Sequence, residues 1–305
     1  MNALPDFPDF KPISMDMSDY LLPFCRGLNS GISEFTFANF FLDSLKYNYK
    51  ISRLSHNSMV IIGNGPSRKL AEKDLGSIFF SVLGDIPQKE QLDYLFINFC
   101  YWKNMPQDLE KKTTQLLSSD SFQIIEDRDN FDYIYLRENL ASLSGKALHK
   151  KKNLVNAFIS SYKAEVLPLS PYSLTDAISV LESWKKSRQQ ENLGDYNQCG
   201  LALEQFKKIG LEGVVAYADG VPVAFSLGER ICNGTMFVTM FEKAISGYKG
   251  VYQFVNRAQA LNLPSSVIYI NREQDLGDLG LRQAKTTYRP CSFTKKYLVL
   301  PLTLC

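Results

Sequence analysis

Two glutamates in the C-terminal half of the chain have the type and spacing that suit acyl or amine chemistry. Glu229 and Glu242 each continue a run of apolar residues at alternate positions of a predicted strand. These runs are Val221, Val223, Phe225 and Leu227 before Glu229, and Met236, Val238 and Met240 before Glu242. Since alternate residues of a strand face one side, we expect both carboxylates to point with the core near the ends of neighbouring strands. A buried charge is costly unless it is paired, so it usually has a partner or a role.

Lys285 supplies a cation that could meet these carboxylates. In the predicted helix over 279–286, the spacing of Leu281, Ala284, Lys285 and Tyr288 predicts one inward-facing side. The strand-to-helix segment before it is rich in charge, at a position that often binds ligands in open α/β sheets. The candidate substrate-binding residues are Asn271, Arg272, Glu273, Asp275, Arg282 and Tyr288. Such a cluster is typical either of a site for acyl chemistry or of an ion-pair network that ties helix to sheet.

A second group of candidates is basic and lies on a long predicted helix over 138–158. At about 100° per residue, Lys146, His149 and Lys150 share one polar stripe with Asn153. Lys151 falls among apolar residues, where it must reach solvent, form a pair or face a cleft. A solvated surface is the commoner reason for such a stripe, but basic residues on one face also suit nucleic-acid or lipid phosphates. The candidate phosphate-binding residues are therefore Lys146, His149, Lys150 and Lys151.

Histidines, cysteines and glycines indicate no further chemistry. The chain has two distant histidines, His56 and His149, and six scattered cysteines without a Cys-x-x-Cys pair, so we expect no metal and reduced thiols. The segment Gly63-Asn64-Gly65 lacks a third glycine, which favours a turn over a phosphate cradle. No Ser/His/Asp or Cys/His constellation is evident.

The elements that must position these residues alternate between helices and strands. In the first part we expect helices over 34–47 and 68–82, with strands at 49–53, 58–62, 94–99, 121–125 and 132–136. In the second part we expect a helix capped by Ser173 and Asp176, a hairpin around Asp219-Gly220, helices over 201–208, 250–261 and 279–286, and strands at 163–168, 235–242, 267–271 and 294–300. This order predicts an N-terminal domain (1–137) whose first 30 residues are an irregular lead-in, a basic linker helix (138–160) and a C-terminal domain (161–305) that carries the candidate site.

Composition agrees with a protein of two packed domains. The 305 residues are 45% hydrophobic and carry a net charge of +2, so a polyanion would have to bind a local patch. No apolar run approaches the ~18–20 residues that span a bilayer, and the first residues lack the pattern of a signal peptide. We expect a cytoplasmic protein without a transmembrane segment, and peripheral membrane contact stays open.

Several segments resemble a known family. The run from Gly280 to Pro290, followed by Lys296-Tyr297-Leu298-Val299, is similar to the C-terminal motif of phosphatidylglycerol lysyltransferases. Segments 33–39, 145–151, 242–244 and 271–277 resemble uncharacterised relatives of that domain, and the order of elements in the second half resembles the GNAT acyltransferase fold. The resemblance implies an α/β (α+β) fold of two tandem GNAT-like domains, each with a mixed, mostly antiparallel sheet flanked by helices. It also implies aminoacyl transfer from aminoacyl-tRNA, with Lys285 matching the family's functional lysine.

The chain departs from the family in two places. Lysyltransferases carry a membrane-spanning part and use a lipid acceptor, whereas no segment here could span a bilayer, so the acceptor is unidentified. Acyl-CoA enzymes of this fold need a Gly-rich loop for pyrophosphate, and only one glycine of that pattern remains in Gly247–Tyr252, which disfavours acyl-CoA as a cofactor.

We therefore expect an aminoacyltransferase in which Lys285 stabilises the oxyanion or the departing ribose hydroxyl. Glu229 or Glu242 would hold the α-ammonium of the donor or act as a base. A CoA-dependent N-acetyltransferase and a non-catalytic RNA- or partner-binding module are the alternatives.

Overall fold

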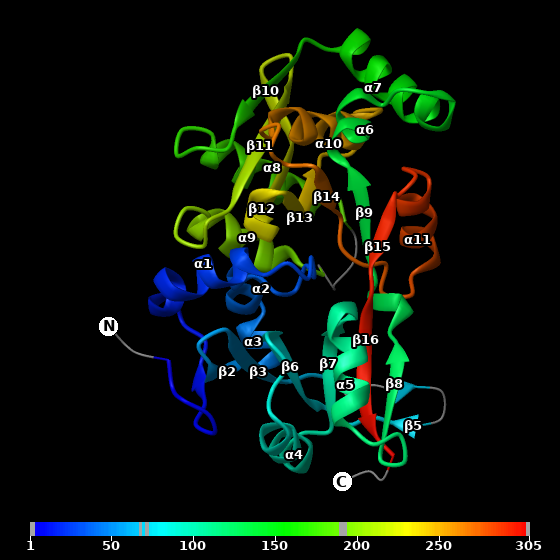
Figure 1. Cartoon of the computed structure of the whole chain (residues 1–305). Helices are drawn as coiled ribbons and strands as arrows, with labels where there is room; N and C mark the ends of the chain where they lie inside the picture. Colours follow the sequence, from blue (N-terminus) through cyan, green and yellow to red (C-terminus); the bar gives the residue numbers. More distant parts are fainter. Residues whose placement is uncertain (1–3, 67–68, 71–72, 189–193, 303–305) are drawn as a thin grey trace. The chain divides into compact units, whose positions relative to one another are not determined.

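The computed structural model describes residues 4–66, 69–70, 73–188 and 194–302 (Figure 1). The chain forms two compact units, one of residues 1–131 with 294–305 and the other of residues 132–293. Each unit contains one seven-stranded sheet. The expected fold class, an α/β protein with two mixed, mostly antiparallel sheets flanked by helices, is confirmed.

The sheet of the first unit has the strand order β1-β2-β3-β6-β7-β16-β8. Its strands are β1 (Lys11–Pro12), β2 (Lys50–Ser55), β3 (Ser58–Asn64), β6 (Ile78–Gly84), β7 (Tyr101–Pro106), β16 (Lys296–Pro301) and β8 (Phe122–Glu126). Only the β6–β7 pair is parallel among these neighbours. A separate ribbon pairs β4 (Lys69–Leu70) with β5 (Lys73–Asp74). The helices are α1 (Ser18–Gly27), α2 (Phe37–Leu42), α3 (Ser44–Tyr47), α4 (Lys89–Asn98) and α5 (Glu110–Leu116).

The lead-in expected to be irregular over the first 30 residues contains the helix α1. Three further expected elements of the first unit differ from the structure. The helix expected over 34–47 is two short helices, α2 and α3. The helix expected over 68–82 is wrong, because the strand β6 begins at Ile78 and residues 67–68 and 71–72 lie outside the described ranges. The strand expected at 94–99 is also wrong, since Leu92, Leu95 and Phe96 are buried along one side of α4. β6 is buried on both faces, and such a strand has no alternation to distinguish it from a helix.

The sheet of the second unit has the order β10-β11-β12-β13-β14-β9-β15. Its strands are β10 (Ala164–Pro168), β11 (Glu212–Ala218), β12 (Val221–Ile231), β13 (Met236–Ala244), β14 (Tyr269–Asn271), β9 (Asp132–Leu136) and β15 (Ser292–Thr294). The pairs from β10 to β13 are antiparallel, β13–β14 is parallel and β14–β9 is antiparallel. The helices are α6 (Arg137–Ser142), α7 (His149–Ser161), α8 (Leu174–Lys186), α9 (Tyr196–Gln205), α10 (Val251–Asn262) and α11 (Leu279–Thr286). The hairpin around Asp219-Gly220 and the helix over 279–286 are confirmed.

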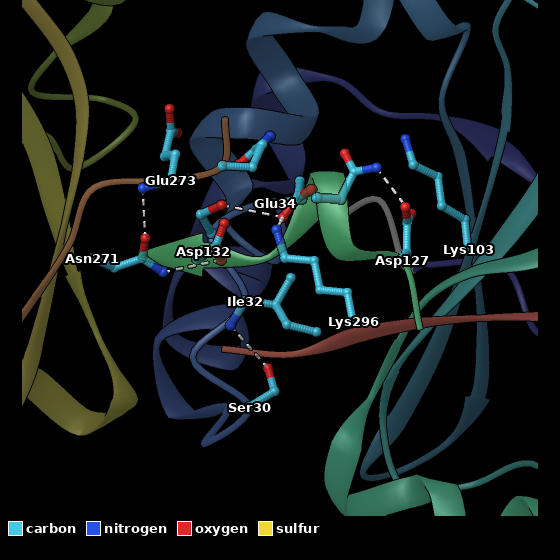
Figure 2. Close-up of polar contacts among 12 residues, drawn as sticks. Ser30, Ile32, Glu34, Lys103, Asp127, Asp132, Asn271, Glu273 and Lys296 are labelled. Carbon is cyan, nitrogen blue, oxygen red and sulfur yellow. Dashed lines mark hydrogen bonds and ion pairs between the residues drawn. The ribbon is translucent and has the colours of Figure 1, made fainter. Parts of the chain in front are cut away.

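Two strands do not lie in the unit that the sequence predicts. β16, expected to complete the second domain, lies between β7 and β8 of the first sheet, and β9 lies between β14 and β15 of the second. The units therefore divide after 131 and 293 rather than at 137 and 160. All six residues of β16 are buried, and its Lys296 forms an ion pair with Glu34 (Figure 2). The sequence of an apolar strand does not indicate which sheet the strand joins, because either of the two sheets could bury both of its faces.

The predicted linker helix is interrupted. α6 ends at Ser142, where Leu143 adopts a left-handed conformation (φ +48°) and Gly145 follows with φ +82°. A short 3-10 helix, Lys146–Leu148, then leads into α7 at His149. A single continuous helix over 138–158 is therefore wrong, and Lys146 does not share a helix with Lys150.

The predicted capping box at the start of α8 is also wrong. Ser173 Oγ donates to the Pro168 carbonyl at 2.9 Å, and Asp176 Oδ2 accepts from the Tyr217 hydroxyl at 2.8 Å. Both side chains thus fix α8 to the hairpin side of the unit instead of capping one another. The helix expected over 201–208 begins earlier, at Tyr196, while part of the loop expected before it, 189–193, lies outside the described residues.

Candidate functional site

The two glutamates singled out in the sequence lie on opposite faces of the second sheet. The register of β12 and β13 shifts between Leu227 and Gly228, so that Ser226 is opposite Glu242 whereas Glu229 is opposite Val238. A bulge of one residue reverses the side to which all later residues point. The prediction that Glu229 and Glu242 share one face is therefore wrong, because it assumed an unbroken ladder. Glu229 is fully buried on the face away from Glu242.

Glu242 belongs to a group of charged residues around one tyrosine ring. Its Oε1 accepts from Arg272 Nη2 at 3.3 Å and its Oε2 from Asn256 Nδ2 at 3.1 Å. The Arg272 guanidinium lies 4.8 Å from the centroid of the Tyr288 ring, and Lys151 Nζ lies 4.3 Å from the same centroid. We call Lys151, Glu242, Arg272 and Tyr288 the Tyr288 cluster. Three separate segments meet here, namely α7, the end of β13 and the residues on either side of α11.

Burial lowers the pKa of both cations of the Tyr288 cluster, but neighbouring charges raise the pKa of Arg272 and lower that of Lys151. Burial is the largest single influence and lowers the pKa of Arg272. The Glu242 carboxylate, together with Tyr288 and Tyr135, outweighs it, so the pKa is raised. The pKa of Lys151 is lowered, first by burial and second by the charge of Arg272. The side chains of Arg272 and Glu242 are 16% and 13% exposed, so their ion pair is only partly screened by water.

Lys285 reaches from α11 to the loop that precedes this helix. Its Nζ donates to the backbone carbonyls of Arg272 at 2.6 Å and Gln274 at 2.5 Å. Burial lowers the pKa of Lys285 to about 8. Nearby carboxylates, chiefly that of Glu273, act against this decrease, and Arg272 adds to it. Within the described residues, the contacts of Lys285 include neither Glu229 nor Glu242, so the acidic groups around it differ from those expected.

The loop that carries these carbonyls is held in a strained but well-supported conformation. Glu273 and Leu276 both have a left-handed backbone, with φ +55° and +53°. Asn271 Oδ1 accepts from the Glu273 amide at 2.7 Å, and Asn271 Nδ2 donates to Asp132 Oδ2 at 3.0 Å (Figure 2). Asn271 and Asp132 are fully buried. Strain of this kind persists only where surrounding contacts determine it, so the loop is pre-organised. We call Asp132, Asn271, Glu273 and Lys285 the Lys285 cluster.

Asp275 and Arg282 anchor the same loop to α11. Arg282 donates through Nε to Asp275 Oδ2 at 3.0 Å and through Nη2 to Oδ1 at 2.9 Å, and the Tyr133 hydroxyl and the Gly277 amide add contacts at 2.6 and 2.9 Å. Burial alone would raise the pKa of Asp275, but these donors outweigh it and hold the pKa well below its ordinary value. This pair has the geometry of the ion-pair network that the sequence left open.

The inward side of α11 differs from the prediction. Leu281 is 47% exposed and Ala284 is also exposed, whereas Arg282 and Lys285 are half-buried and Tyr288 is buried beyond the helix end. The apolar spacing mispredicted the inward side of α11, because this helix contacts the loop before it through Arg282 and Lys285. Lys146, His149 and Lys150 are exposed, and only Lys151 of the basic group reaches the Tyr288 cluster.

Sequence reasoning missed three polar residues of the site. Asp132 and Tyr133 lie in β9, which was assigned to the other domain, and Asn256 lies in α10 among buried residues. A local signal existed for Asn256 alone, since an amide on an apolar helix face requires a polar partner.

Of the helices in the described ranges, none combines the length and apolar character that crossing a bilayer requires.

Comparison with known proteins gives a consistent result. The family model described as "Phosphatidylglycerol lysyltransferase, C-terminal" matches residues 26–300. A crystal structure of a conserved protein of unknown function from Bacteroides thetaiotaomicron is 28% identical, with a TM-score of 0.83 over 96% of this chain and 99% of that one. The structure of L-PGS from Bacillus licheniformis is 12% identical, with a TM-score of 0.63 over 95% of this chain and 92% of that one, and shows the same fold.

A curated relative matches only in part. An uncharacterised protein of Mycoplasmoides gallisepticum is 26% identical over 179 residues, which is 55% of this chain and 55% of that protein. The chain therefore spans about half the length of this curated relative.

Proposed function

This chain belongs to the phosphatidylglycerol lysyltransferase C-terminal family, and we propose that it transfers an aminoacyl group from aminoacyl-tRNA to an acceptor that is not yet identified. Membership supports an aminoacyl-tRNA-dependent acyltransferase at the level of the superfamily. The observation that carries the finer proposal is the position of Lys285, whose ammonium is held by two backbone carbonyls beside Glu273.

Lys285 is suited to the charge that develops in acyl transfer. Two of its N–H groups donate to the carbonyls of Arg272 and Gln274, which leaves the third without an acceptor among the described residues. In the proposed reaction the acceptor attacks the ester carbonyl, and this third N–H donates to the oxyanion that forms. A fixed donor is effective because no reorganisation is needed when the charge appears.

The same ammonium can complete the proton balance. As the tetrahedral intermediate collapses, the ester C–O bond breaks and the departing ribose oxygen takes a proton from Lys285. The proton lost by the acceptor restores the ammonium. A lysine whose pKa is about 8 gives up its proton near neutral pH more readily than an ordinary lysine does. Glu273, which is half-buried, would bind the α-ammonium of the aminoacyl group, the role expected of Glu229 or Glu242.

The start of α10 supports an RNA donor rather than acyl-CoA. Gly250 precedes α10 with φ +86°, and a Cβ there would lie 2.1 Å from the Leu154 carbonyl of α7. The glycine that remains from the pyrophosphate pattern thus permits close packing of two helices. Lys146, His149 and Lys150 are exposed near the start of α7 and would contact phosphates of the tRNA.

The proposal is tested by following a label from tRNA to an acceptor. The chain is incubated with tRNA charged with labelled amino acids and with a lysate extract as the acceptor pool. We expect Lys285→Met to lower the rate of transfer about 10²–10³-fold, the effect of removing one oxyanion donor. The wild-type chain failing to move label would contradict the proposal.

A matched control separates chemistry from loop stability. Arg282→Met removes the anchor of the same loop but keeps the Lys285 ammonium. Both variants lose contacts to the loop, so both should lower the melting temperature. We expect Arg282→Met to retain far more transfer than Lys285→Met at a similar melting temperature. Equal losses of transfer would assign Lys285 a structural role only.

A further inference from the structure

The Tyr288 cluster holds more positive than negative charge. Lys151 and Arg272 lie over the same buried ring, and the Glu242 carboxylate is bound to Arg272 and Asn256. Across the part of the chain that the structure describes, no carboxylate forms an ion pair with Lys151. The cluster therefore holds two cations and one carboxylate, and that carboxylate is paired with Arg272. A half-buried ammonium beside a guanidinium is unfavourable unless an anion offsets the repulsion.

The helix that carries Lys151 adds to this imbalance. α7 has thirteen residues and begins with His149, Lys150, Lys151 and Lys152. Its first turn contains no acidic residue, and no side chain caps it. The amides at a helix N-terminus carry partial positive charge and favour carboxylates there, so a row of lysines opposes the usual preference. Both observations are explained if an anion binds where Lys151 meets Arg272.

We infer that the Tyr288 cluster binds a phosphodiester group of the RNA donor, held between Lys151 and Arg272. This inference rests on the proposed function and names the subsite that would place the donor. A guanidinium and an ammonium together suit a phosphate, because the guanidinium can bind two oxygens in one plane and the ammonium a third.

The exposed residues around the cluster favour a strand of phosphates over an isolated one. Lys146, His149, Lys150 and Lys152 are exposed at the start of α7 and just before it. A single phosphate or a lipid headgroup would need only the two cations of the cluster. Successive phosphates of one RNA strand would also use the exposed residues.

Arg272 connects this subsite with the reacting centre. Its side chain lies over Tyr288, while its backbone carbonyl accepts from Lys285 Nζ at 2.6 Å. Arg272 would therefore contact the phosphodiester through its side chain and Lys285, the lysine proposed to act on the ester, through its backbone carbonyl. Binding of the RNA would thus orient its acylated end.

The inference is tested by binding of deacylated tRNA, which needs no chemistry. Lys151→Gln and Lys152→Gln are compared by fluorescence anisotropy over a range of salt concentrations. Both remove one charge from neighbouring positions of α7, but Lys152 is exposed and outside the cluster. We expect Lys151→Gln to weaken binding about tenfold, as for a lost hydrogen bond to a charged group, and Lys152→Gln less than about twofold. The salt slope should decrease by about 0.7 in Lys151→Gln, as for one lost contact to a single-stranded phosphate.

Three outcomes would overturn the inference. The first is an equal loss of tRNA binding in both variants, which would indicate only general electrostatic attraction. The second is unchanged tRNA binding with lost binding of phosphatidylglycerol vesicles, which would assign the cluster to a lipid headgroup. The third is a marked decrease in the melting temperature of Lys151→Gln, because Lys151 would then stabilise the fold through Tyr288.

These results can be distinguished from a failure of the proposed function. If tRNA binding depends on Lys151 but no label is transferred, the subsite stands and the proposed chemistry falls. If label is transferred and binding is indifferent to Lys151, the chemistry stands and the subsite is wrong.

Discussion

The two units share one arrangement of strands but differ in the side chains that pack against it. In each sheet, one parallel pair has antiparallel pairs on both sides, and a helix connects its two strands, α4 between β6 and β7 and α10 between β13 and β14 (Figure 1). In the first unit Phe80, Phe96 and Trp102 pack together at this place. In the second, Glu242 lies near the end of β13 and Arg272 directly follows β14.

The difference shows that the arrangement alone does not make a site. α10 buries two amide side chains, Asn256 and Gln259, whereas α4 buries Leu92, Leu95 and Phe96. A polar helix face requires polar partners, and Glu242 provides one for Asn256. The candidate site therefore depends on a few polar residues within a framework that both units share.

The largest expected effect concerns the aromatic packing of the first unit. Trp102→Ala removes a fully buried side chain and leaves a cavity, which should lower the free energy of unfolding by about 3–5 kcal/mol. Denaturant titration measures this loss. If the first unit has only a structural role, transfer per folded molecule should stay near that of the wild type. A rate that falls while the protein is still folded would show that the first unit contributes to the reaction.

A pH profile examines the second unit. Lys285 must be protonated to donate, and its pKa of about 8 lies below that of an unfolded lysine. The rate of transfer should thus fall about tenfold per pH unit above 8, and the decline should begin at higher pH in Lys285→Arg. The free energy of unfolding should change in the opposite direction. Because the pKa of Lys285 is lower in the folded state, its contribution to stability is fully present above the unfolded pKa and is lost as pH falls through about 8. A rate that is flat to pH 10 would remove Lys285 from the proton transfer.

The smallest effect concerns the loop anchor. Asp275→Asn removes a buried carboxylate from Arg282, and Arg282 can still be solvated because its side chain is 33% exposed. We expect a loss of about 2 kcal/mol in the free energy of unfolding at neutral pH. Because the pKa of Asp275 is lowered in the folded state, its contribution is present above its unfolded pKa and is lost as pH falls below about 4. The difference between wild type and variant should therefore shrink in acid, as thermal unfolding at two pH values would show.

Local signals were sufficient for much of the second unit. The turn at Asp219-Gly220 and the helix over 279–286 depend on neighbouring residues and were predicted at the right places. The charged segment between β14 and α11 was also recognised, and it contains Arg272 and Glu273. Such features rest on short-range physics, namely turn conformation and periodic burial.

The remaining errors have a long-range cause. One extra residue in β13, Met240, shifts the register where Leu227 is opposite Phe241 and Gly228 is opposite Thr239. Glu229 therefore lies on the face opposite Glu242, and alternation in the sequence cannot show such a bulge. Asp132 was missed because β9 pairs with β14, far along the chain. Apolar segments such as Ile78–Gly84 fit a helix or a strand equally well until their neighbours are known.

The position of β16 constrains how the molecule can be made. During translation every other strand of the first sheet leaves the ribosome before β16, so β7 and β8 must wait for the strand that separates them. Until then their backbone groups are available to wrong partners, and the carboxylate of Glu34 lacks the ammonium of Lys296. The first sheet can therefore be completed only after all residues of the second unit have been synthesised.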